Sequence, residues 1–92
     1  MPSVTVRIPA VLAQVGDGRT AIPVEAGTVG GALEALFAVL PQLRVHVFDE
    51  SGGIRPHVAL FHEGRTVRGV AGLAGPVAHG DVVTVLQAVS GG

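Results

Sequence analysis

The chain has 92 residues, of which 48% are hydrophobic and 14% charged, with a formal net charge of −1 and no cysteine. This length and composition predict one folded domain spanning residues 1–92 and exclude disorder, a disulfide scaffold, a thiolate nucleophile and a Cys-bound metal. The charge balance and the lack of a long apolar run argue against nucleic-acid and membrane partners, so we expect a cytoplasmic protein.

The opening of the chain is predicted to form a hairpin. Apolar residues alternate with polar ones over residues 4–8, which is typical of a half-buried strand. Residues 16–18 read Gly-Asp-Gly, a turn signal, and the alternation resumes over residues 20–25. Pro23 cannot donate a hydrogen bond to a neighbouring strand, so the second strand is expected at a sheet edge or a bulge.

A helix is predicted over about residues 28–40. Thr28 is a good N-cap residue, and Pro41 ends the helical pattern. Gly30 and Gly31 have low helix propensity and weaken the first turn. Five apolar residues fall on one helical face that should pack on a core, namely Val29, Leu33, Leu36, Phe37 and Leu40.

The second half of the chain predicts further strands. Residues 42–56 give no clear element, although Val45 and Val47 alternate with His46 and residues 51–53 indicate a mobile loop. Strands are expected at 57–62, 65–68 and 82–88, with one helical turn near Leu73. The order predicts an α+β fold: a mixed four- to five-stranded sheet covered by one main helix, with the first and last long strands as central, parallel neighbours.

Several residue groups are weak candidates for catalysis or metal binding. The four histidines, at 46, 57, 62 and 79, lack a metal-ligand spacing and are expected to be ordinary surface or loop residues. Asp49 and Glu50 are expected in a solvated turn rather than in a cleft. The glycine-rich run at 69–75 is not followed by Lys and Ser or Thr, so a flexible turn is expected rather than a phosphate site.

The end of the chain carries the strongest functional signal. A Gly80-Asp81 turn leads into an apolar strand, and the sequence ends Ala88-Val89-Ser90-Gly91-Gly92. With the predicted element order, these features resemble the MoaD/ThiS family of ubiquitin-like sulfur carriers, which have the β-grasp fold. The segments Val4–Pro9 and Gly27–Val29, together with the ending, are most similar to carriers of the CysO type, used in a route to cysteine.

The resemblance implies a carrier that is a protein co-substrate and not an enzyme. A MoeB/ThiF-like activating enzyme, which itself binds ATP and Mg²⁺, would adenylate the carboxylate of Gly92. Sulfide or a protein persulfide would then yield a C-terminal thiocarboxylate, which passes sulfur to an acceptor bound on a synthase. The residues leave three acceptors open: a cysteine precursor, molybdopterin, or a secondary metabolite. The resemblance implies no metal or cofactor bound to the carrier itself.

A partner-binding surface follows from strand parity and from the family's use of this sheet face. If Val58 and Leu60 face the core, the side chains of the alternate strand residues face outward, and these are Ala59, Phe61, Thr84, Leu86 and Ala88. Phe61 and Leu86 would then form an exposed apolar patch; a one-residue error in register would instead bury Phe61. Ser90 and Gly91 belong to a flexible tail, 89–92, narrow enough to enter an enzyme channel.

Two other functions remain open from the sequence. The chain could be a ubiquitin-like modifier that forms isopeptide bonds through Gly92, or a β-grasp interaction module whose tail has no chemical role. All six basic residues are arginine. The absence of lysine blocks chains linked through this protein's own side chains but leaves conjugation to other proteins open.

Overall fold

The computed structural model describes residues 1–87 of the chain. Its strands are β1 (Ser3–Arg7), β2 (Ala21–Glu25), β3 (Val58–His62), β4 (Arg65–Val67) and β5 (Val82–Gln87). Its helices are α1 (Ala10–Ala13), α2 (Val29–Val39), α3 (Arg44–Val47) and α4 (Gly69–Leu73), with a 3-10 turn over Pro41–Leu43.

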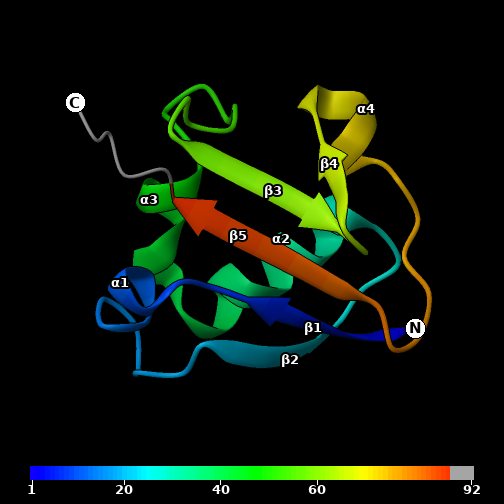
Figure 1. Ribbon diagram of the computed structural model, residues 1–92, viewed down its shortest axis with the longest axis horizontal. Helices are drawn as coiled ribbons and strands as arrows, with labels where there is room; N and C mark the ends of the chain where they lie inside the picture. Colours follow the sequence, from blue (N-terminus) through cyan, green and yellow to red (C-terminus); the bar gives the residue numbers. More distant parts are fainter. Residues whose placement is uncertain (88–92) are drawn as a thin grey trace.

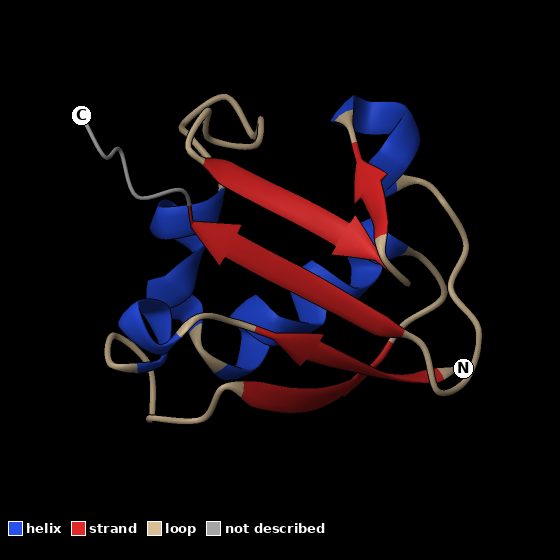
Figure 2. Cartoon of the chain, viewed as in Figure 1, coloured by secondary structure: helices blue, strands red, loops and turns tan. Residues whose placement is uncertain are grey.

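The described strands form one mixed sheet in the order β2-β1-β5-β3-β4. Strands β1 and β5 are parallel neighbours near the centre, and the other pairings are antiparallel. Helix α2 lies across one face of this sheet, whose other face carries no described helix (Figures 1 and 2). The predicted α+β fold, the central parallel pair and the single main covering helix are therefore confirmed.

The edge position predicted for Pro23 is also confirmed. Strand β2 lies at the end of the sheet, where Pro23 is in register with Thr5 of β1. On an edge strand, the missing backbone N–H removes no hydrogen bond from the interior of the sheet. Pro23 also makes this edge a poor template for a further strand.

Helix α2 begins where its cap predicts. The Thr28 hydroxyl oxygen accepts a hydrogen bond from the Gly31 backbone N–H at 2.9 Å. Gly30 has a packing reason to lack a side chain: a Cβ at this position would lie 3.1 Å from the Leu73 carbonyl oxygen. The small residue therefore lets the end of α4 approach the first turn of α2.

The core lies between α2 and the sheet. Side chains of alternate strand residues meet the apolar face of α2, and all of the following are below 9% exposed: Val4, Val6, Ile22, Val24, Val58, Leu60, Val83, Val85, Val29, Ala32, Leu33, Leu36 and Phe37. Burial of apolar area is the main term that offsets the entropy cost of folding, so this layer stabilises the register of the whole sheet.

Two short helices were not predicted from the sequence. Helix α1 and helix α3 have four residues each, a length that is unstable as an isolated helix. Leu12 in α1 and Val47 in α3 are each 1% exposed. Tertiary packing therefore stabilises both helices, and the alternation around His46 reflects a helical turn, not a strand.

Candidate functional site

The outward side of strands β3 and β5 is the first candidate surface. In the antiparallel register, Ala59 is opposite Leu86 and Phe61 is opposite Thr84. Phe61 and Leu86 are thus diagonal neighbours on the same side of the sheet, a geometry in which Cα atoms lie roughly 7–8 Å apart. We call these four residues, Ala59, Phe61, Thr84 and Leu86, the β3–β5 face.

Burial confirms the predicted strand parity. Val58, Leu60, Val83 and Val85 are buried, whereas Leu86 is 46% exposed. Ala59, Phe61 and Thr84 are partly exposed. Phe61 is therefore not a core residue, and the face combines a branched aliphatic side chain with an aromatic ring on a rigid sheet. Such a surface is suited to binding another protein.

The remaining predicted site residues are Ala88, Ser90, Gly91 and Gly92, and these lie outside the described residues, as does the predicted flexible tail 89–92. The last described residue, Gln87, is opposite Val58. One of the two strands that form the β3–β5 face, β5, is therefore followed in the sequence by the Gly-Gly end.

The start of β5 is held by a set of polar contacts. The Glu63 carboxylate accepts a hydrogen bond from the Val82 backbone N–H at 2.7 Å. The Asp81 carbonyl oxygen accepts one from the Thr5 N–H at 3.0 Å. Together with pairing to β1 and β3, these bonds fix the register of β5 on both sides, so the strand is a rigid base for the segment that follows it.

His62 corrects the expectation that all four histidines are ordinary surface residues. Its Nε2 lies 2.7 Å from the Asp81 carboxylate, with the two side chains 15% and 19% exposed. The Ala78 backbone N–H and then His62 hold the pKa of the Asp81 carboxyl below its usual value. The pair ties the end of β3 to the turn before β5, and no local pattern predicts it because 19 residues separate the partners.

The other titratable groups do not assemble a catalytic site within residues 1–87. No group of three or more His, Asp or Glu side chains there has the geometry to hold a metal ion. His57 precedes β3 in a turn rather than lying on the strand. Asp49 accepts hydrogen bonds from the Ser51 N–H and hydroxyl and from the Gly53 N–H, so this carboxylate orders its own loop, as the prediction of a structural turn requires.

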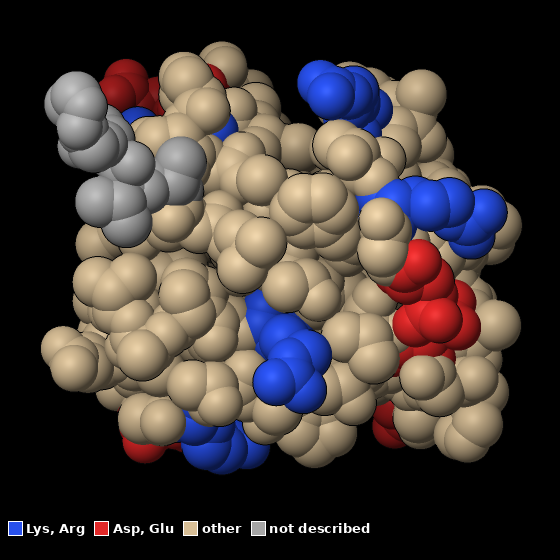
Figure 3. Space-filling view, viewed as in Figure 1, with Lys and Arg blue, Asp and Glu red and all other residues tan. Residues whose placement is uncertain are grey.

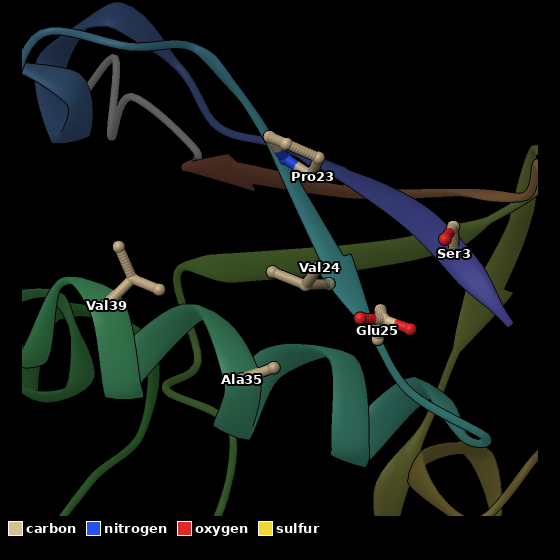
Figure 4. A pocket seen from close by; sticks show the side chains of 6 residues that line it. All are labelled: Ser3, Pro23, Val24, Glu25, Ala35 and Val39. Atoms are coloured by element: carbon tan, nitrogen blue, oxygen red, sulfur yellow. The ribbon is translucent and has the colours of Figure 1, made fainter. Parts of the chain in front are cut away.

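A groove of about 440 Å³ lies at the β2 edge of the sheet, between β2 and α2 (Figure 4). Its lining residues are Ser3, Pro23, Val24, Glu25, Ala35 and Val39. Glu25 is its one ionisable side chain, so the groove lacks a paired acid and base. It shares no lining residue with the β3–β5 face, and β1 separates the edge strand β2 from β5 in the sheet.

No described helix is both long and apolar enough to cross a membrane.

Comparison with known proteins gives matches over almost the whole chain. The model of the ThiS family matches residues 6–92. The sulfur carrier protein CysO of Mycobacterium tuberculosis is 33% identical over 92 residues, covering 98% of this chain and 99% of that protein. Small archaeal modifier protein 1 of Haloferax volcanii is 35% identical over 83 residues, covering 88% and 91%.

Solved structures agree with the sequence matches. The crystal structure of Mycobacterium tuberculosis CysO aligns with a TM-score of 0.83 and 32% identity, covering 94% of this chain and 99% of that one. The Haloferax volcanii modifier aligns with a TM-score of 0.84 and 31% identity, covering 98% and 99%. A chain of the Amycolatopsis orientalis BexX/CysO complex gives 0.85 and 26%, covering 97% and 99%. These neighbours confirm the predicted β-grasp fold.

Proposed function

Because this chain belongs to the ThiS family, we propose that it is a sulfur carrier whose reactive group is the C-terminal carboxylate of Gly92. The observation that carries the proposal is the extent of the match: the family model reaches residue 92 and therefore includes the Gly-Gly end. The full-length similarity to CysO supports the same reading. We expect the carrier to serve as a co-substrate for partner enzymes, in the cytoplasm.

The proposed chemistry has two steps. The Gly92 carboxylate attacks the α-phosphorus of ATP and displaces pyrophosphate, which gives an acyl adenylate. Hydrosulfide then attacks the acyl carbon and displaces AMP, which leaves a thiocarboxylate. Adenylation is required because a carboxylate is a poor electrophile, whereas a mixed anhydride has a good leaving group. ATP and Mg²⁺ would bind to a MoeB/ThiF-like activating enzyme, and a synthase would bind the sulfur acceptor.

The β3–β5 face is the docking surface in this proposal. Leu86 and Phe61 would supply apolar contact area, and Ala59 and Thr84 would complete a flat surface between them. Ala88, Ser90 and Gly91 would connect this surface to the reacting carboxylate. A glycine stalk without Cβ atoms suits a narrow channel. The β3–β5 face would therefore bind the enzyme, while the stalk would carry the reacting carboxylate.

ATP–pyrophosphate exchange with the cognate activating enzyme tests the proposal. Deleting Gly92 shortens the reach by roughly 3.3–3.6 Å, a displacement that would take the carboxylate out of attacking distance. We expect the full chain to support exchange and the deletion variant to bind the enzyme without supporting exchange. Normal exchange by the deletion variant would contradict the carrier function.

A second candidate function is protein modification through Gly92. The similarity to a protein named as a small archaeal modifier favours it. The same adenylate would then be attacked by a lysine amine of a target protein, which forms an isopeptide bond and releases AMP. Conjugates in the native cell that disappear when Gly92 is deleted would support this function.

A further inference from the structure

Arg7 is an exposed cation on the same side of the sheet as the β3–β5 face. It is the last residue of β1, where it is in register with Ala21 on β2 and with Thr84 on β5. Its neighbours Val6 and Ile8 are buried, so the Arg7 side chain alternates to the outward side.

The register places Arg7 beside the apolar centre of the face. Thr84 has Arg7 opposite it on one flank and Phe61 opposite it on the other. Leu86, two residues further along β5, is therefore a diagonal neighbour of both Arg7 and Phe61. An exposed aliphatic side chain thus lies diagonally next to both an aromatic residue and an arginine.

The charge of Arg7 has no carboxylate partner within residues 1–87. The ion pairs between arginine and carboxylate there join Arg19 to Asp17 and Arg44 to Glu34. Glu25, the one acidic residue among the outward-facing strand positions, is opposite Ser3, at the other end of β1 from Arg7. Figure 3 shows this side of the molecule, with basic atoms near its middle surrounded by uncharged ones.

We infer that the enzyme that docks on the β3–β5 face presents a carboxylate to Arg7, next to an apolar pocket that receives Leu86. This inference rests on the proposed function and adds the chemistry of the partner's surface. An enzyme that covered Leu86 would also remove water from the neighbouring guanidinium, and a desolvated charge is costly unless an opposite charge replaces the water. Arg7 is therefore the specificity-determining charge of the face.

Binding of three variants to the cognate activating enzyme tests the inference. Arg7→Gln removes the charge and Arg7→Glu reverses it, whereas Arg68→Glu is a control that makes the same charge change at an exposed residue before α4. We expect Kd to rise about 10-fold for Arg7→Gln and about 100-fold for Arg7→Glu, with little change for Arg68→Glu. The affinity of the wild-type chain should also fall with added salt more steeply than that of Arg7→Gln.

Three results would overturn the inference. Equal losses in Arg7→Glu and Arg68→Glu would show a general effect of net charge, and wild-type affinity in Arg7→Glu would show that no carboxylate faces Arg7. A wild-type dimer that Arg7→Glu dissociates, seen by sedimentation, would assign the face to a second copy of the chain. Failure of the proposed function would be a separate observation. In that case neither the wild-type chain nor any variant would support ATP–pyrophosphate exchange, whichever residue stood at position 7.

Discussion

Replacing Leu86 with Asp should separate partner binding from folding. Leu86 is 46% exposed, so docking can still bury about half of its side chain, which corresponds to about 0.7–1.4 kcal/mol of apolar burial. An aspartate would add the cost of desolvating a charge, and we expect a total loss of about 2–3 kcal/mol of binding energy, or roughly 30–150-fold in Kd. The free energy of unfolding should change by less than about 1 kcal/mol, because the site is on the surface.

The neighbouring residue provides the matched control. Val85 is fully buried on the other side of the same strand, and Val85→Ala should lower the free energy of unfolding by about 2–3 kcal/mol while leaving binding of the folded protein unchanged. Urea denaturation measures the first quantity, and the concentration dependence of ATP–pyrophosphate exchange measures the second. Wild-type exchange with Leu86→Asp, or a large stability loss without a binding loss, would refute the assignment of the β3–β5 face.

Three further predictions concern stability. Leu36→Ala, at a fully buried site in α2, should cost about 2–5 kcal/mol in urea denaturation, whereas Val39→Ala, at a site 53% exposed in the same helix, should cost less than about 0.5 kcal/mol. The pKa of Asp81 is lowered in the folded state, so its ionised carboxylate stabilises the fold above the unfolded-state pKa, and this stabilisation is lost as pH falls through the folded-state pKa. Asp81→Asn should therefore be less stable than the wild type at pH 7 and should lose less stability than the wild type on acidification below about pH 4. Gly80→Ala should destabilise the protein by about 1–2 kcal/mol because the φ of Gly80 is +88°. Gly27→Ala should not destabilise it, because Gly27 has no positive φ and has open space around it. Thermal unfolding of the two variants checks this difference.

The parts of the fold that the sequence predicted are those with a periodic pattern. The stripe from Val29 to Leu40 predicted α2, and alternation predicted which side chains of β3 and β5 face outward. Pro23 predicted an edge position or a bulge because its missing N–H is a local chemical fact, and the structure places it on the edge strand β2. In each case the residue pattern and the physical requirement lie within one element, so no knowledge of tertiary contacts was needed.

The features that the sequence did not predict depend on contacts between distant segments. Helices α1 and α3 are too short to carry a periodic signal and exist because Leu12 and Val47 are buried by other elements. The His62–Asp81 pair and the position of Arg7 beside Leu86 both follow from strand order and register. A sequence shows which residues a strand exposes but does not by itself show which residues of the neighbouring strands lie beside them.

Intact mass of the carrier, after incubation with its activating enzyme, ATP and sulfide, is the most direct test of the central claim. The claim predicts a mass gain equal to the difference between one sulfur and one oxygen atom, with the change located at Gly92 by fragmentation and absent when Gly92 is deleted. An unchanged mass under conditions in which the enzyme activates another carrier of the family would contradict it.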